Sequence, residues 1–250
     1  MPYIDIRGKN LYYSVSGEGP VMVFLHGCGR SSKVFGMELQ KYTTFCRVIA
    51  FDLPGHGLSS EIHLKNELYW EQSAEIIAQA LQKLNIEHFF VVGIRDGAII
   101  GLLLAKILFD KITGVFCDSF DGNEITPEQA IRTVRHRKRI QRFFLFRLFE
   151  SFTMGENWKK ILSEDNQRLL WFVRHRRFFF DQPLEISCPV TFTCSLKDEE
   201  IPTIIEKMNR MKQIVPNANT IFFEGGKHPS FLSNNQEYLE IIHQFVKNLK

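Results

Sequence analysis

The sequence predicts an α/β protein built around one mostly parallel, doubly wound sheet. Short apolar runs alternate along the chain with longer stretches of helical periodicity, and the run "VMVFLHG" ends in glycine. Continuous apolar runs are typical of parallel strands that helices cover on both faces. An alternation of strands and helices implies right-handed crossovers between neighbouring strands. At 250 residues, the chain is long enough to bury a large core.

Each expected element follows from its local pattern. The stretches "YIDIRG" and "NLYYSVSG" indicate two short strands joined by a hairpin at Gly8-Lys9. Residues 68–84 place Ile76, Ile77 and Leu81 on one helical stripe. Further strands are expected at 21–27, 46–52, 88–93, 112–118, 188–195 and 219–226, and further helices at 97–109, about 202–214 and 235–249.

Residues 119–186 interrupt this alternation. They are rich in arginine and phenylalanine and have helical propensity. Because they follow a strand, they leave the sheet at its carboxyl edge, where folds of this class bind ligands. We therefore expect a helical cap over 119–186 and a core domain formed by 1–118 and 187–250.

The expected cap mixes basic and aromatic residues in "IRTVRHRKRIQRFFLFRLFESF" (131–152) and in "LLWFVRHRRFFF" (169–180). The favoured interpretation is a pair of amphipathic helices with phenylalanine against the core and arginine in water. One alternative is a pocket for anionic or aromatic acyl ligands. A less favoured one is contact with an anionic membrane surface. No recognition motif for nucleic acid accompanies these residues, so we expect no nucleic-acid partner.

Composition narrows the function classes further. The net charge of +3 does not by itself indicate nucleic-acid binding, and the five cysteines form no C-x-x-C pair. We therefore expect no disulfide framework, no metal and no cofactor. The start "MPYIDIRGKN" lacks the features of a secretory signal, and no apolar run approaches the ~18 residues of a membrane span. A cytoplasmic protein is the expectation, and the oligomeric state is not indicated.

Five motifs resemble those of the α/β-hydrolase superfamily, in the same order and each after an expected strand. They are "FLHGCG" (24–29), "FDLPGHGLSS" (51–60), "GIRDG" (93–97), "SLKDEEIP" (195–202) and "GGKHPSFL" (225–232). The resemblance spans most of the chain and implies an α/β-hydrolase fold that acts on small carboxylic esters, amides or thioesters. In motif, "GIRDGAIIGLLLA" and "FEGGKHPSFL" are most similar to the valacyclovir hydrolase-like branch, whose strand-to-helix elbow reads G-x-S-D-G.

The resemblance implies a catalytic base and an acid that orients it. The base would be His228, after the last strand, because a neutral imidazole can take and return one proton. The acid would be Asp198, although an exposed loop carboxylate is the alternative for this residue. His56 belongs to a structural turn of the family.

The same resemblance implies an oxyanion hole and a pocket. The backbone N–H groups of Cys28 and Asp96 would stabilise a developing negative charge. For the loop at Gly27 the alternative is a tight turn that needs glycine for its backbone angles. The residues expected to line the pocket are His26, Gly27, Asp118 and Ser119.

Arg95 stands where the family has its nucleophile, between Gly93 and Gly97. A guanidinium offers donors but no acceptor, so it cannot attack a substrate. Asp96 lies one place too late to replace the nucleophile, although dehalogenase-like members use aspartate. Cys28 is a second substitute, if its thiol pKa is depressed by Arg95 and His228, but we favour a backbone role for it.

Three hypotheses about function follow. The chain is a serine-type hydrolase left inactive or very weak by Arg95, or a non-catalytic protein that binds a small carboxylate or phosphate. The third is a variant or engineered form of an active enzyme with serine at position 95. Because an unpaired buried guanidinium is costly, Arg95 is expected to pair internally, with Asp198 or Asp96 as candidates.

Overall fold

The computed structural model describes residues 2–61, 66–201 and 203–249, and in this part of the chain eight strands form one sheet. The strands are β1 (Tyr3–Ile6), β2 (Lys9–Ser16), β3 (Val21–Leu25), β4 (Arg47–Phe51), β5 (Phe89–Ile94), β6 (Ile112–Asp118), β7 (Val190–Ser195) and β8 (Asn219–Phe223). Their order is β1-β2-β4-β3-β5-β6-β7-β8. Strand β2 runs antiparallel to β1 and β4, and all other neighbours are parallel. The predicted mostly parallel sheet is confirmed.

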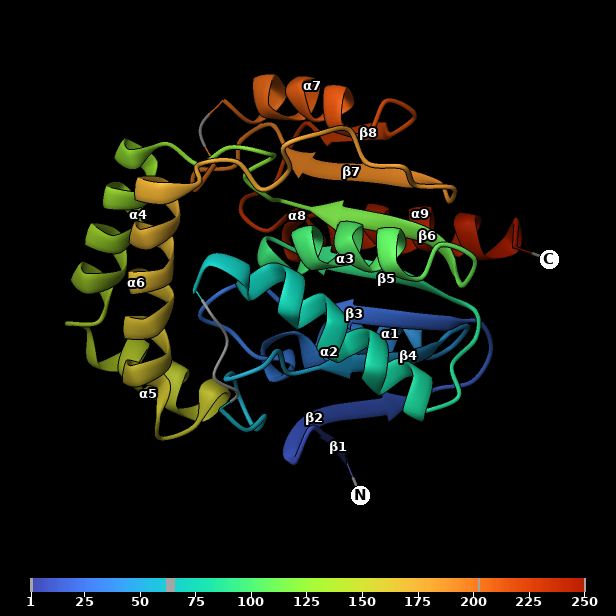
Figure 1. Cartoon of the computed structure of the whole chain (residues 1–250), viewed down its shortest axis with the longest axis horizontal. Coiled ribbons are helices and arrows are strands. Elements are labelled where there is room, and N and C mark those ends of the chain that lie inside the picture. The colour runs from blue at the N-terminus through green and yellow to red at the C-terminus, as the bar shows by residue number, and fades with distance from the viewer. Residues whose placement is uncertain (1, 62–65, 202, 250) are drawn as a thin grey trace.

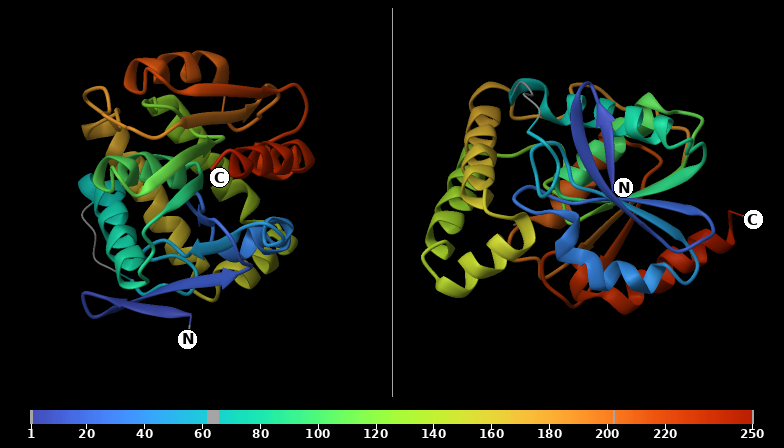
Figure 2. Two further views of the ribbon diagram at one scale, coloured as in Figure 1. Left: turned by 90° about the vertical axis from the view of Figure 1, so that its right-hand side faces the viewer. Right: turned by 90° about the horizontal axis from the view of Figure 1, so that it is seen from below.

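Helices cover both faces of this sheet (Figures 1 and 2). The described helices are α1 (Gly36–Tyr42), α2 (Tyr69–Lys83), α3 (Asp96–Ile107), α4 (Pro127–Ile140), α5 (Phe144–Met154), α6 (Trp158–His175), α7 (Ile204–Ile214), α8 (Ser230–Ser233) and α9 (Asn235–Lys247), with 3-10 turns at Ser32–Phe35 and Asn66–Leu68. Helices α2, α3 and α7 share one apolar core with the sheet, and α1, α8 and α9 share the other. Burial from both sides explains the unbroken apolar sequence of β5, which is buried along its whole length.

The expected elements agree with the structure to within a few residues, and two helices are additional. Helix α1 begins at a glycine, a poor helix former, and α8 is a four-residue turn in the loop after His228. Neither has a periodic apolar pattern long enough to predict it. The expected helix over about 202–214 corresponds to α7, and Pro202 lies outside the described residues.

Helices α4, α5 and α6 lie between β6 and β7 in sequence and beyond the carboxyl ends of the parallel strands in space (Figure 1). Pro127 begins α4, and Thr126 and Gln129 form a capping box that satisfies its first N–H groups. Helices α4 and α6 pack against each other. The predicted helical character of this segment is confirmed, and its assignment as a separate cap stays a prediction.

The expectation that phenylalanines of this segment pack against the core is wrong for α5. Four of them are between 47% and 67% exposed, namely Phe143, Phe144, Phe149 and Phe152. The helix turns Glu150 inward instead, because this buried carboxylate pairs with Arg30 at 2.5 Å. In the second aromatic stretch the expectation holds, since Phe172 and Phe179 are buried and stack on each other.

Candidate active site

The turn between β5 and α3 is a tight elbow with Arg95 at its apex. Arg95 has φ +52° and ψ −113°, a left-handed conformation that side chains other than glycine rarely adopt. A Cβ atom at Gly93 would collide with the backbone of Gly97, and one at Gly97 would collide with the carbonyl of Leu25. Both glycines are therefore required by close backbone packing, and the strained frame of the elbow persists although its central residue is an arginine.

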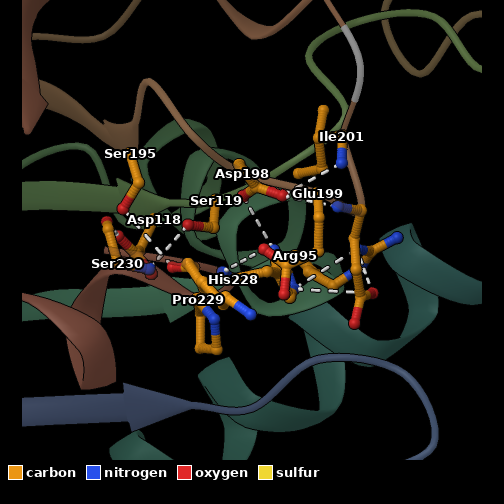
Figure 3. Close-up of polar contacts among 12 residues, drawn as sticks. Arg95, Asp118, Ser119, Ser195, Asp198, Glu199, Ile201, His228, Pro229 and Ser230 are labelled. Atoms are coloured by element: carbon orange, nitrogen blue, oxygen red, sulfur yellow. Dashed lines mark hydrogen bonds and ion pairs between the residues drawn. The ribbon is translucent and has the colours of Figure 1, made fainter. Parts of the chain in front are cut away.

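The guanidinium of Arg95 contacts three side chains from other loops, and Figure 3 shows it next to His228. Its Nη2 is 3.2 Å from Asp121 Oδ2, and its Nη1 is 3.1 Å from Glu200 Oε2. Nη1 also donates toward His228 Nε2 at 3.3 Å. The Arg95 side chain is 13% exposed, so these partners hold a largely buried charge.

Two carboxylates neutralise this buried charge. Burial acts to lower the pKa of Arg95, but the surrounding acidic groups, with Asp121 the largest contributor, outweigh that effect and the pKa is raised. The expectation that Arg95 has an internal partner is confirmed. The predicted partners, Asp198 and Asp96, are wrong, because Asp96 accepts from Trp70 Nε1 at 3.1 Å and Asp198 is bound to His228.

Asp198 and His228 form a hydrogen-bonded pair next to Arg95 (Figure 3). His228 Nδ1 lies 2.9 Å from Asp198 Oδ2, while Asp198 Oδ1 accepts the N–H groups of Glu200 and Ile201 at 2.9 and 3.0 Å. Burial acts to raise the pKa of Asp198, but the hydrogen bond and charge of His228 and the two N–H donors lower it overall. An ionised Asp198 assigns the proton to Nδ1 and leaves Nε2 as the acceptor. That acceptor is the atom to which Arg95 donates.

The loop after β3 brings Gly27 and Cys28 against the elbow. A Cβ atom at Gly27 would lie 3.0 Å from Arg95 Cβ, so glycine lets the two loops approach closely. Cys28 Sγ lies 2.6 Å from Arg137 Nη2, on α4. Burial raises the pKa of the Cys28 thiol to about 11, against the opposing effect of Arg137. Burial therefore disfavours the alternative of Cys28 as a thiolate with a depressed pKa.

His26 points away from the cavity into the core of the molecule. Its Nε2 accepts the N–H of Leu53 at 2.9 Å, which leaves Nδ1 to donate to the carbonyl of Gly27 at 2.7 Å. Burial lowers the pKa of His26 to about 4, so the imidazole is neutral. The structure gives His26 a place in fixing the loop rather than in lining a pocket.

Asp118 and Ser119 are also fully buried, next to Ser230 in the loop after His228 (Figure 3). Asp118 accepts from the N–H of Phe231 at 3.1 Å and from the Ser230 hydroxyl, and Ser119 Oγ accepts the N–H of Ser230 at 2.9 Å. Neither is among the residues that line the cavity at Arg95. Asp118 and Ser119 therefore do not line the pocket as predicted. They anchor α8 and thereby hold the loop that carries His228.

A cavity of about 490 Å³ opens beside Arg95. It lies between the loop after β3, the elbow, the His228 loop and helices α4 and α5. Its lining includes Cys28, Arg95, Arg132, Arg137, Phe149 and His228. The sequence pattern places Arg132 and Arg137 in the basic stretch 131–152 but does not single them out as pocket residues.

A second charged cluster also contacts the loop after β3. Asp165 on α6 accepts from Gly29 N–H and from Arg168 Nη1, and its Oδ2 is 3.1 Å from His56 Nε2. His56 and Asp165 are both buried. Helix α6 is thus tied through one carboxylate to the loop that carries Cys28.

Comparisons with known proteins identify the fold family. A model of the α/β hydrolase fold family matches residues 20–146, about half of the chain. A pimeloyl-[acyl-carrier protein] methyl ester esterase of Aliivibrio salmonicida is 22% identical over 95% of this chain and 96% of its own length.

Two solved structures share the architecture. An esterase from Exiguobacterium antarcticum superposes with a TM-score of 0.76 at 16% identity, covering 98% of each chain. A mutant of an epoxide hydrolase from Bacillus megaterium gives a TM-score of 0.72 at 19% identity, covering 98% of this chain and 99% of its own. The chain belongs to the α/β hydrolase fold family.

Proposed function

We propose that this protein binds a small carboxylic acid or acylated anion in the Arg95 cavity and does not form an acyl-enzyme intermediate. The observation that carries the proposal is the contact of Arg95 with His228 Nε2. In a serine hydrolase the general base takes the proton of a hydroxyl nucleophile. Here the elbow carries a group that holds its proton at every accessible pH, and this group donates to the base.

Arg95 itself is a poor anchor for a ligand, because Asp121 and Glu200 already balance its charge. Arg137 is the better candidate. Its guanidinium donates to Asn166 Oδ1 at 3.1 Å and lies against the Cys28 thiol, and among the described residues it forms no ion pair with a carboxylate. A partly buried guanidinium with no carboxylate in direct contact among the described residues is suited to a carboxylate or phosphate that enters the cavity.

The start of α3 favours an anion at the same place. Asp96 is the first residue of this helix, so its N–H belongs to the first-turn donors that have no acceptor within the helix. Donors at a helix N-terminus attract negative charge. We propose that the N–H groups of Cys28 and Asp96, inherited from an oxyanion hole, contact the anionic group, with segment 119–186 as the cap that encloses it.

The class of ligand is inferred from the relatives. Their names include an esterase of a carboxylic methyl ester, and the fold carries such sites beyond the carboxyl ends of its strands. The apolar part of the cavity, which includes Phe146 and Phe149, suits the hydrocarbon portion of an acyl compound. A carboxylate with an apolar tail or aromatic ring satisfies both ends of the cavity.

Calorimetric titration with short fatty acids and benzoate tests this proposal. Each acid is compared with its own amide, which has the same shape and no charge. We expect the acid to bind about 10-fold to 100-fold more tightly, since a hydrogen bond to a charged group contributes about 1.5–3 kcal/mol. Arg137→Met should remove the preference, and Arg137→Lys should restore part of it.

The matched control is Arg139→Ala, two residues away on the exposed side of α4. It should leave acid binding unchanged. Equal binding of acid and amide by the unaltered protein, or an unchanged preference in a folded Arg137→Met, would contradict the proposal.

A further inference from the structure

Helix α5 exposes an apolar stripe to solvent. The stripe consists of Phe143, which caps the helix, and of helical residues spaced three to four apart, which fall on one face. Its members are Phe143, Phe144, Leu145, Leu148, Phe149 and Phe152, and their exposure ranges from 47% to 76%. An exposed set of large apolar residues of this size is unusual on a monomeric protein and marks an interaction surface.

The opposite face of α5 fixes its orientation. Glu150 is buried in its ion pair with Arg30, and the Ser31 hydroxyl donates to the carbonyl of Thr153 at 2.7 Å. Met154 packs in a small core with Trp158 of α6. The stripe therefore points outward because polar contacts hold the other side of the helix, and rotating α5 to bury it would break them.

Exposed basic side chains precede the stripe along the chain and alternate with it. They are Arg135, Lys138, Arg139, Arg142 and Arg147, from the end of α4 through α5. The sequence has no aspartate or glutamate between Glu128 and Glu150, and Glu150 is buried and paired. The segment thus joins a large apolar face with a positively charged rim that holds no exposed carboxylate between these two residues.

We propose that α5 and the end of α4 form a docking surface for bilayers that contain anionic lipids. Aromatic and leucine side chains enter the boundary between headgroups and acyl chains, and arginine and lysine contact lipid phosphates. A second copy of the chain fits less well, because two like-charged rims would face each other. No described helix is long and apolar enough to cross a bilayer, so α5, with 11 residues, would lie in the interface.

The proposed surface adjoins the cavity. Phe149 belongs to the exposed stripe and also lines the cavity beside Arg95. Docking through α5 would therefore bring the cavity to the level of the headgroups, where amphiphilic acyl compounds reside. The docking proposal itself does not depend on what the cavity binds.

Vesicle co-sedimentation of the full chain tests the proposal. The probes are phosphatidylcholine vesicles and vesicles in which part of this lipid is replaced by phosphatidylserine. We expect binding to the anionic vesicles that weakens with salt, and little binding to the neutral ones. Each charge reversal at Arg139 or Arg142 should weaken binding by about five-fold or more, since one basic residue near such a surface contributes about 1 kcal/mol.

The apolar stripe is tested by the pair Phe144→Ser and Leu148→Ser, which should reduce vesicle binding by about ten-fold or more. The matched controls are Phe109→Ser, a 54% exposed phenylalanine elsewhere on the molecule, and Arg174→Glu, at the other end of α6. Both control variants should bind the anionic vesicles as tightly as the unaltered chain does.

Absence of binding to anionic vesicles, or full binding by a folded Phe144→Ser/Leu148→Ser protein, overturns the proposal. A dimer in sedimentation velocity that this double variant abolishes, with no vesicle binding, also overturns it and identifies a second copy as the occupant.

Discussion

Two buried charged clusters lie against the loop that carries Cys28, and they differ in the exposure of their carboxylates. In the first, Asp165, 1% exposed, joins His56, Arg168 and the Gly29 N–H. In the second, Arg95 joins Asp121, the half-exposed Glu200 and His228 beside a cavity of about 490 Å³. The first cluster ties helix α6 to this loop, whereas the second lies at the elbow between β5 and α3, beside the cavity.

The charge balance of the two clusters explains this difference. The first cluster has one carboxylate between a histidine and an arginine, and every partner is within 3.1 Å. The second has two carboxylates around Arg95, one of them, Glu200, 47% exposed. An exposed carboxylate such as Glu200 can move when a ligand arrives, whereas moving the buried Asp165 would leave its partners unpaired at a large penalty.

Asp165→Asn should have the largest effect on stability. It leaves Arg168 and His56 buried without their carboxylate, and breaking a buried pair costs about 3–5 kcal/mol. Urea unfolding at neutral pH measures the loss. A cost below about 1 kcal/mol would show that this cluster does not hold α6 to the loop.

The pH dependence of that loss follows from the two pKa shifts. Burial acts to raise the pKa of Asp165, but His56 and Arg168 lower it overall, so its contribution is lost as pH falls below the ordinary value of 3.8. Burial acts to lower the pKa of His56, but Asp165 raises it overall, so its contribution is complete below 6.5 and lost as pH rises through the raised value. The difference in unfolding free energy between the unaltered protein and Asp165→Asn should therefore be largest between about pH 3.8 and pH 6.5. A difference that grows steadily above pH 8 would contradict this assignment.

Much of this comparison could be predicted from the sequence, but the partners of the charges could not. The glycine frame around Arg95, and Asp198 with His228, follow from motifs whose positions are set by strand ends. Asp121 and Glu200 lie in loops after β6 and β7, and their directions depend on backbone conformations that no periodic pattern encodes.

The inward direction of Arg137 could be predicted from the spacing along α4. Ala130 and Val134 are buried on this helix, and Arg137 follows on the same stripe. In α5 the apolar pattern does not identify the buried face. Apolar residues lie around most of the helix, so the sequence does not indicate that Glu150 rather than phenylalanine faces inward.

Substitutions of the two carboxylates that pair with Arg95, Asp121 and Glu200, should cost less stability than Asp165→Asn, and by different amounts. Asp121→Asn should cost about 1–3 kcal/mol, because its carboxylate is 16% exposed and also lies 3.6 Å from Lys207 Nζ. Glu200→Gln should cost less than about 1 kcal/mol, since water screens a carboxylate that is 47% exposed. Matched denaturant titrations of the two variants measure both values, and the reverse order would assign the main support of Arg95 to Glu200.

The central claim is that Arg95 takes the place of a nucleophile while the acid and base of the family stay in position. Mass spectrometry after incubation with p-nitrophenyl acetate, butyrate and octanoate tests it most directly, with the unaltered chain compared with Arg95→Ser. We expect no acyl adduct at the elbow of the unaltered chain, and an acyl group on residue 95 of Arg95→Ser that Asp198→Asn greatly reduces. An adduct on the elbow or on Cys28 of the unaltered chain, or a folded Arg95→Ser that never acylates with any ester, would contradict the claim.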